Sequence, residues 1–313
     1  MSVSSKYLFS QASALRAVGR AAVGSLVRSA QRPGVLPGPW IEQELPPRSE
    51  ELVRAYVRHV GGDPAHYRGR LPPHFVPQWG FDLAGRALAQ AGYPLTRVIN
   101  AGFRFESYEP IPSGETLFVK ARLESVEDDG RRAKLVARVI TGTHHASEAL
   151  VAEWRTYVPL ASGGKKGEGA KTGANGSTPG RPQITVPVSA REIAYFRLKK
   201  DAGLDFAKLT GDINPIHWVP ALARAAGFRS CILHGFSTFA RAHEAIVRNV
   251  FSGDANAIRA MEGRFTRPLV LPAAVGVYVS RGGDGGVYVG DAPGGGAYLE
   301  GSFESRTRSQ AEE

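Results

Sequence analysis

The stretch from Thr210 to Pro220, TGDINPIHWVP, places an acid, an amide and an imidazole within six residues. Pro215 fixes a backbone dihedral angle between Asp212 and His217, and it biases Asn214 toward an extended conformation. The side chains of Asp212 and His217 can therefore converge on one small volume. A neutral imidazole beside an ionised carboxylate can hold a single water molecule and move its protons. The motif predicts acid–base chemistry on a bound water.

A second feature follows further along the chain, where LHGFSTFARAHEAI predicts a helix that begins at Gly235. Glycine has no β-carbon, so a ligand can approach its backbone N–H, which points outward from the helix N-terminus. A donor placed there can stabilise the charge that a thioester carbonyl gains when its α-carbon is protonated or deprotonated, typically by about 100- to 1000-fold in rate. Standing alone, Asp212 would be interpreted as a helix cap or an Asx turn. With His217 and Gly235 in register, the catalytic interpretation is favoured.

The elements that must position these residues fall into two halves. Residues 161–183, ASGGKKGEGAKTGANGSTPGRPQ, contain almost no large apolar side chain and cannot offset the entropy of ordering, so they are predicted to be a flexible linker. We divide the chain into a basic leader (1–40), a first domain (41–160), the linker (161–183) and a second domain (184–313).

The two halves resemble each other in the same order along the chain. HVGGDPAHYRG in the first half is similar to KLTGDINPIHWVP, and PPHFVPQWGFDLAGRALAQ is similar to CILHGFSTFARAHEAIV. Similarity kept in order indicates a duplicated domain. In the first half the motif is shortened to Asp63-Pro-Ala-His66, a spacing that does not allow the same convergence. We expect that half not to be catalytic, the alternative being a second active site.

Each half combines one longer helix with several strands. The helices are expected over residues 79–91 and 235–249. Residues 114–126, 133–143 and 147–160 show the apolar alternation and β-branched content of antiparallel strands. A helix laid on an antiparallel sheet makes each half an α+β domain.

Composition narrows the classes of function. The chain has 313 residues, 39 basic against 29 acidic, and a net charge of +10, which suggests an anionic partner. The basic residues are scattered, without the aromatic interleaving of a single-strand platform, so nucleic acid is disfavoured. No apolar run is long enough to span a bilayer. A single cysteine excludes an intramolecular disulfide and favours a reducing compartment, the cytoplasm.

The first forty residues contain five basic side chains and no acid. On a helical wheel Leu15, Val18 and Leu26 lie opposite Arg16 and Arg20. Two interpretations stay open. The leader is either an organelle-targeting or membrane-surface helix, or an N-terminal helix packed on the folded domain.

Taken together, TGDINPIH…AGF…ILHG…F resembles the hydratase 2 signature of the MaoC-like dehydratases, the (R)-specific enoyl-CoA hydratases, and the duplication resembles their double-hotdog members. The resemblance implies a double hotdog fold, in which Asp212 and His217 activate water and Asn214 orients them or the substrate. It also implies that Gly235 is the oxyanion donor and that Phe265 lies near the acyl thioester. It implies no metal and no redox cofactor.

The implied reaction is hydration of trans-2-enoyl-CoA to (3R)-3-hydroxyacyl-CoA, or the reverse, with the first half accommodating the acyl chain. One alternative is dehydration of a 3-hydroxyacyl group on acyl carrier protein. The other is a non-catalytic acyl-thioester or lipid binding module. A homodimer is compatible with either enzyme.

Three further side chains receive structural interpretations. Cys231 lies in an apolar run and is expected to be a small buried residue. His234, at a helix start, is expected to be a hydrogen-bonded structural histidine, and His243 to be solvated or packed. Cys231 and His234 form a Cys-x-x-His pair without a second spaced pair, which is a weak zinc signal, so no metal is expected.

Overall fold

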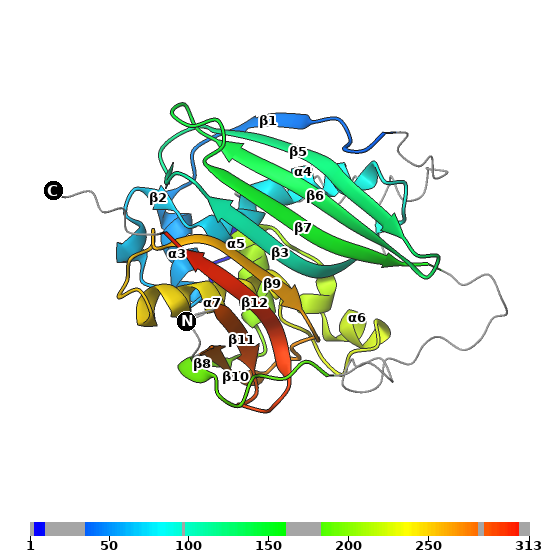
Figure 1. Ribbon diagram of the computed structural model, residues 1–313, viewed down its shortest axis with the longest axis vertical. Coiled ribbons are helices and arrows are strands. Elements are labelled where there is room, and N and C mark those ends of the chain that lie inside the picture. Colours follow the sequence, from blue (N-terminus) through cyan, green and yellow to red (C-terminus); the bar gives the residue numbers. More distant parts are fainter. Residues whose placement is uncertain (1–2, 10–34, 96–97, 161–182, 281–284, 307–313) are drawn as a thin grey trace.

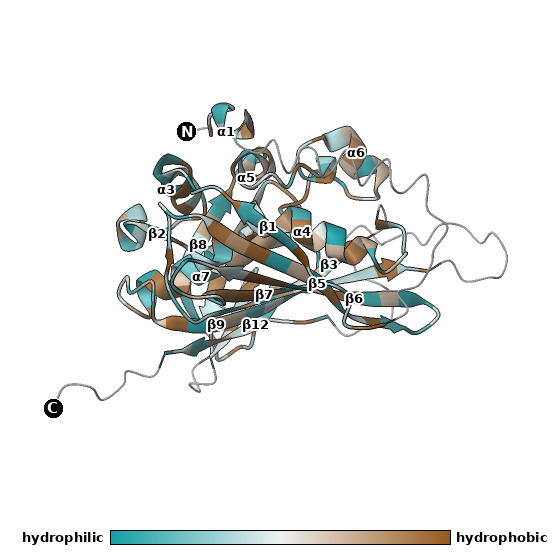
Figure 2. Cartoon of the chain, turned by 90° about the horizontal axis from the view of Figure 1, so that it is seen from above, coloured by the Kyte–Doolittle hydropathy of each residue, from teal (hydrophilic) through white to brown (hydrophobic). Residues whose placement is uncertain are grey.

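The computed structural model describes residues 3–9, 35–95, 98–160, 183–280 and 285–306. They form an antiparallel sheet of ten strands with helices gathered on one face (Figures 1 and 2). The sheet strands are β1 (Ile41–Leu45), β3 (Ile99–Ser107), β5 (Leu117–Asp128), β6 (Arg132–Gly142), β7 (Leu150–Pro159), β8 (Arg191–Leu198), β9 (Ile258–Phe265), β10 (Ala273–Val279), β11 (Gly286–Gly290) and β12 (Ala297–Ser305). A separate two-stranded ladder joins β2 (Arg70–Leu71) and β4 (Ile111–Pro112).

The helices are short, and all except α1, which belongs to the leader, lie within one half of the chain. They are α1 (Lys6–Phe9), α3 (Glu50–His59), α4 (Pro77–Ala89), α5 (Ala202–Thr210), α6 (Pro220–Ala225) and α7 (Gly235–Asn249), with 3-10 turns η1 (Pro64–Tyr67), η2 (Pro73–Phe75) and η4 (Pro215–His217). Among the described residues no helix is long and apolar enough to cross a membrane.

The two halves are joined edge to edge in one sheet. The strand order is β1-β5-β6-β7-β3-β9-β12-β11-β10-β8, so β3 of the first half pairs directly with β9 of the second. Close approach requires glycine here, because a β-carbon at Gly102 would lie 2.7 Å from the Gly263 carbonyl oxygen. Each half contributes five strands to the described sheet, together with its own helices, which confirms the predicted α+β fold. The predicted linker falls on residues 161–182, outside the described residues, and on Gln183.

The predicted helices and strands agree closely with those of the structure. Helix α7 has the expected bounds, Gly235–Asn249, and packs on strands of both halves. Helix α4 begins two residues earlier than expected, at Pro77, because proline is well suited to the first turn of a helix. Strands β5, β6 and β7 lie within or close to the three predicted segments.

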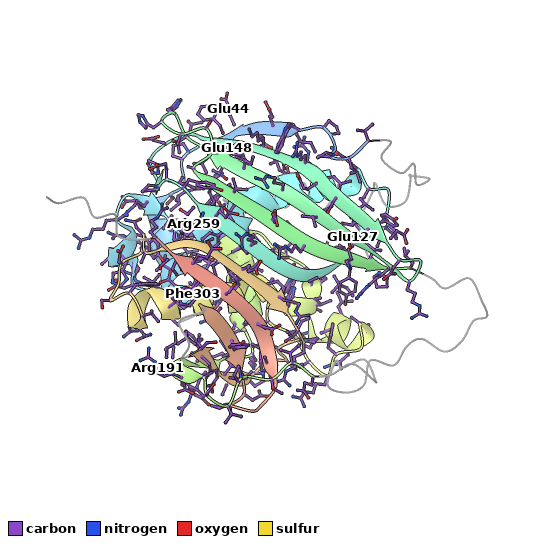
Figure 3. The ribbon with its side chains drawn as sticks, viewed as in Figure 1. Glu44, Glu127, Glu148, Arg191, Arg259 and Phe303 are labelled. Atoms are coloured by element: carbon purple, nitrogen blue, oxygen red, sulfur yellow. The ribbon has the colours of Figure 1, made fainter. Side chains whose placement is uncertain are left out.

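One sheet face is apolar and covered by helices, and the other is charged. Along β5, buried residues alternate with partly exposed ones, as a half-buried strand requires. Where the halves meet, the outer face carries an ion-pair array in which Arg104 contacts Glu106 (3.1 Å) and Arg259 contacts Glu106 (3.6 Å) and Glu304. Figure 3 labels Arg259 on this face. These pairs are partly exposed to solvent, so each contributes little to stability.

The first described residues of the leader contact both halves, because Lys6 pairs with Glu51 of α3 while Val3 contacts α5. The Val3 N–H donates to the Asp205 carboxylate (3.1 Å), and the Lys208 ammonium donates to the Val3 carbonyl oxygen (2.9 Å). Residues 10–34, with the arginines of the amphipathic pattern, lie outside the described residues.

Candidate active site

The loop that carries Asp212 and His217 is shaped by two local devices. Helix α5 ends at Gly211, which adopts a left-handed conformation (φ 79°) and donates its N–H to the Ala207 carbonyl oxygen. Three residues later Asn214 caps the turn η4, since its side-chain oxygen accepts from the Ile216 N–H (3.3 Å). The chain thus changes direction twice within a few residues, which brings the side chain of His217 close to that of Asp212.

Asp212 and His217 come together in a nearly buried position. They are 8% and 9% exposed, and their ligand atoms lie, with one of His234, within 4.8 Å of one another. Burial raises the pKa of the Asp212 carboxyl, while His217 and the Asn214 N–H oppose that rise. Burial also lowers the pKa of His217, and the Asp212 carboxylate opposes that fall. The convergence predicted for these two side chains is present.

The tautomer of His217 follows from its hydrogen bond. Its Nδ1 lies 2.8 Å from the Ile232 carbonyl oxygen, which can only accept, so Nδ1 carries the proton. The neutral imidazole therefore presents an unprotonated Nε2. A water molecule beside the pair can donate one hydrogen to Nε2 and the other to the carboxylate of Asp212.

His234 supports both members of the pair. Its ring stacks on that of His217 with the centroids 3.6 Å apart, and its Nε2 donates to the backbone carbonyl of Asp212 (2.9 Å). It is 1% exposed, and burial lowers its pKa well below 6.5. His234 is thus a neutral, hydrogen-bonded histidine that holds the loop. Because His217 Nδ1 and His234 Nε2 already bind carbonyl oxygens, only their other nitrogens are open to a ligand.

Gly235 follows His234 and begins α7. A β-carbon at this position would lie 2.8 Å from the ring of Phe265, the last residue of β9. The Gly235 backbone at the helix N-terminus therefore follows His234 directly and packs against an aromatic ring. The predicted oxyanion donor and the predicted substrate contact, Phe265, are neighbours.

Asn214 is predicted to orient the pair or the substrate, and the structure places it beside Asp212 at the start of η4. The residue is exposed, and its side-chain oxygen is used by the cap of η4. Its backbone N–H is hydrogen-bonded to the Asp212 carboxylate, which lowers the pKa of that carboxyl. Asn214 thus orients Asp212 through the backbone.

Gly203 is a residue of the site that the sequence analysis missed. It lies in the first turn of α5, where a β-carbon would lie only 2.1 Å from the His217 carbonyl oxygen. The absence of a side chain at Gly203 lets η4 pack directly on α5, and this contact sets the position of the His217 backbone relative to that helix. The signal in the sequence was weak, since a glycine inside a short helical pattern has several explanations.

The first half does not reproduce this arrangement. Asp63 caps η1 by accepting from the Ala65 N–H (2.9 Å). The ring of His66 faces Gly253, where a β-carbon would lie 2.6 Å from Nε2. Among the described residues, neither belongs to a close group of histidines and acids. The expectation that this half lacks the catalytic pair agrees with that placement.

Comparisons with known proteins agree with this architecture. The family model described as a MaoC like domain matches residues 174–289. Enoyl-CoA hydratase 2, peroxisomal, of Arabidopsis thaliana is 31% identical over 189 residues, covering 59% of this chain and 59% of that protein. The 3-hydroxyacyl-thioester dehydratase X of Mycobacterium tuberculosis is 25% identical over 278 residues, covering 88% of this chain and 91% of that one.

Solved structures show the same fold. The crystal structure of a MaoC-like dehydratase from Phytophthora capsici matches with a TM-score of 0.69 at 19% identity, covering 88% of this chain and 97% of that one. A Mycobacterium tuberculosis protein described as a double hotdog matches with a TM-score of 0.51 at 15% identity, covering 89% and 93%. The second half of this chain therefore matches the MaoC like domain, and the described chain has the double hotdog fold of the MaoC-like dehydratases to which it is similar.

Proposed function

We propose that the chain is an (R)-specific 2-enoyl-CoA hydratase, equally a 3-hydroxyacyl-CoA dehydratase, whose second half is catalytic. The observation that carries the proposal is the buried pair of Asp212 and His217, with ligand atoms within 4.8 Å and His217 held as the tautomer whose Nε2 accepts. The names of the relatives, enoyl-CoA hydratase 2 and 3-hydroxyacyl-thioester dehydratase X, support an acyl-thioester substrate.

The proposed reaction adds the elements of water across the C2=C3 bond. Water held by Asp212 and His217 bonds through its oxygen to C3, and one of its protons passes to the pair. The electron pair of C2=C3 moves toward the thioester oxygen, where the Gly235 N–H stabilises the developing enolate. A proton from the pair then reaches C2. Neither carbon skeleton nor thioester is broken, and no redox cofactor is needed.

The first half has a different part in this proposal. It supplies the neighbouring strands of the sheet. Because its motif is degenerate, we propose that it provides space for the acyl chain, as the resemblance to the double-hotdog members implies. Because the two halves already pair in one sheet, a single chain provides both domains of the double hotdog. Because a single cysteine favours a reducing compartment, we place the enzyme in the cytoplasm, or in an organelle if residues 1–40 are a targeting segment.

The test is a direct assay of the full chain. Crotonyl-CoA and longer trans-2-enoyl-CoA substrates are followed by loss of enoyl-thioester absorbance, and the product is identified with (3R)- and (3S)-specific dehydrogenases. We expect turnover with the (3R) product. The same acyl groups on acyl carrier protein separate the carrier alternative. Tight thioester binding without turnover would instead support the non-catalytic module and contradict the proposal.

The pH dependence of the reaction follows from the two pKa shifts. Turnover by hydration requires Asp212 ionised and His217 neutral. Burial raises the pKa of the Asp212 carboxyl, so its protonation limits activity at a higher pH than for an ordinary aspartate. Burial lowers the pKa of His217, so its ring stays neutral to a lower pH than an ordinary histidine. We therefore expect kcat/KM to fall toward acid pH as Asp212 is protonated, and we expect Asp212→Asn to remove that acid limb. An acid limb that persists unchanged in Asp212→Asn would contradict the assignment.

A further inference from the structure

A second group of buried polar side chains lies where the two halves meet. His74, from η2 of the first half, faces His243 and Glu244 of α7 in the second half, and the three side chains are 1%, 0% and 1% exposed. One ligand atom from each lies within 4.8 Å of the others. Neither Asp212 nor His217 belongs to this group, and the proposed reaction does not use it.

Some polar atoms of the group have no hydrogen-bond partner among the described residues. Both ring nitrogens of His243 are in this condition, whereas the Glu244 carboxylate also interacts with the Tyr67 hydroxyl. A fully buried imidazole with neither nitrogen satisfied is costly, and such atoms indicate a missing ligand at the centre of the group.

Both ring nitrogens of His74 have oxygen partners. The Tyr56 hydroxyl lies 2.9 Å from Nδ1 and donates to the His74 carbonyl oxygen (3.0 Å). Nε2 lies 2.8 Å from a carboxylate oxygen of Glu244, so a single proton joins these two atoms where no metal is bound. A metal ion held by both atoms would take the place of that proton. Metal-bound histidines commonly have their second nitrogen held by an oxygen in this way.

We propose that His74, His243 and Glu244 bind a divalent metal ion, with Zn²⁺ the best match to two imidazoles and one carboxylate. Zinc bonds of about 2.0–2.2 Å place tetrahedral ligand atoms some 3.3 Å apart, so small side-chain movements close the group around an ion. Because His74 comes from one half and the other two ligands from the other, the ion would cross-link the domains.

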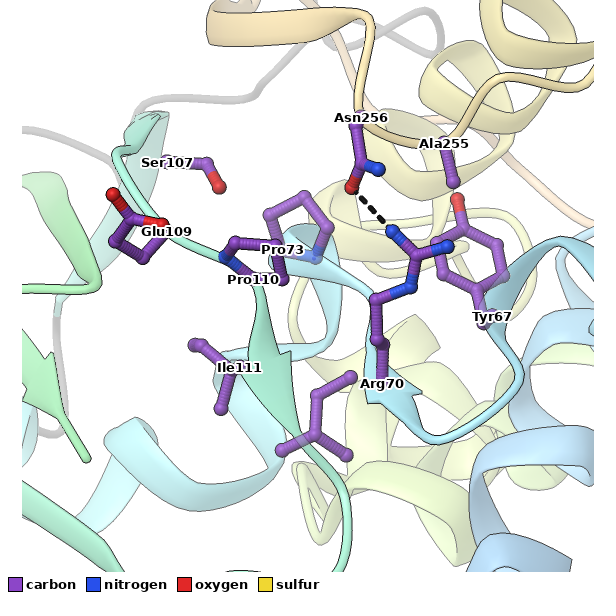
Figure 4. Close-up of a pocket in the computed structure, with 10 residues that line it drawn as sticks. Tyr67, Arg70, Pro73, Ser107, Glu109, Pro110, Ile111, Ala255 and Asn256 are labelled. Atoms are coloured by element: carbon purple, nitrogen blue, oxygen red, sulfur yellow. Dashed lines mark hydrogen bonds between the residues drawn. The ribbon is translucent and has the colours of Figure 1, made fainter. Parts of the chain in front are cut away.

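A buried tyrosine closes the site off from the nearest surface pocket. Tyr67 is buried with its ring edge-on to that of His74, at 6.2 Å between centroids. On its other side Tyr67 lines a surface pocket between the β2–β4 ladder and Asn256, where Arg70 donates to Asn256 (2.7 Å; Figure 4). One aromatic ring therefore separates the pocket from the metal ligands.

The test uses refolding, because a sealed site is filled most readily during folding. The full chain is unfolded with a chelator and refolded without metal, with Co²⁺ or with Zn²⁺, and bound metal is measured after gel filtration. We expect one Co²⁺ per chain with the visible absorption of a four-coordinate ion, its displacement by Zn²⁺, and a Tm higher by about 5 °C with Zn²⁺ than without metal.

Variants assign the site. His243→Leu keeps the buried volume but removes a ligand, and Glu244→Gln removes the carboxylate; each should lose the bound Co²⁺ and the Tm rise. Asp212→Asn, which alters the other histidine-rich group, should keep both. Wild-type protein that refolds to a native circular dichroism spectrum without binding metal overturns the proposal, as does metal lost in Asp212→Asn and kept in the other two. Since hydratase activity is not the readout, failure here leaves the proposed reaction untouched.

Discussion

Asp212→Asn is expected to lower kcat/KM for enoyl-CoA hydration by about 10²- to 10⁴-fold. The amide has nearly the same shape as the carboxylate but cannot take a proton from water. The contact to His234 is made by the backbone carbonyl of residue 212, so it survives the substitution and the loop should keep its conformation. The measurement is steady-state hydration at pH 7.5, with unfolding by urea as a check on stability.

The matched control for that variant is Asp63→Asn. Asp63 occupies the corresponding place in the first half, is exposed and caps η1. Its substitution should leave kcat/KM within about twofold, because a surface change of this kind alters stability by about 0.5 kcal/mol at most. Equal activity of Asp212→Asn and wild type would remove Asp212 from the reaction.

Gly203→Ala is expected to have the second largest effect, although residue 203 touches no substrate. The added methyl group would lie 2.1 Å from the His217 carbonyl oxygen, a backbone atom that can move only with η4. We expect a loss of stability on the order of 1–3 kcal/mol from overpacking. A displacement of His217 by about 1 Å is expected to lower kcat by about 10²-fold.

The control for this variant is another helical glycine. Gly85 lies inside α4, and a β-carbon there would have no neighbour within 4 Å. Gly85→Ala should therefore stabilise the protein by about 0.5–1 kcal/mol and leave kcat unchanged. Urea unfolding and steady-state kinetics on the two variants separate the steric effect from helix propensity. Wild-type kcat in Gly203→Ala would show that the position of His217 does not depend on this contact.

Local patterns predicted the parts of the site that lie close together in sequence. The spacing from Asp212 to His217, with Pro215 between them, specifies a compact loop, and the helix after His234 has a clear apolar periodicity. Residues linked by a few bonds have few ways to be arranged, so their convergence could be anticipated. The same holds for β5, β6 and β7, which form a simple antiparallel run.

Contacts across the chain could not be predicted in this way. Nothing in β3 or β9 alone indicates that they pair, because register depends on both twisted halves at once. His74 and Glu244 are 170 residues apart and meet only after the halves have docked. Glycine is required at position 203 because the His217 backbone packs against it. That contact forms only in the folded structure, so the local sequence gives little sign of it.

The outermost strands of the sheet bear on how the molecule avoids unwanted association. Strands β1 and β8 are the two ends of the described sheet, and Figure 3 labels Glu44 and Arg191 at its opposite margins. Both margins carry charge, with Glu42 and Glu44 on one and Arg191, Glu192 and Arg197 on the other. Ionised side chains along an unpaired backbone discourage a foreign strand from adding there. Pairing of β3 with β9 thus removes two edge strands that could otherwise bind another chain, and the two remaining edge strands of the described sheet carry charged side chains.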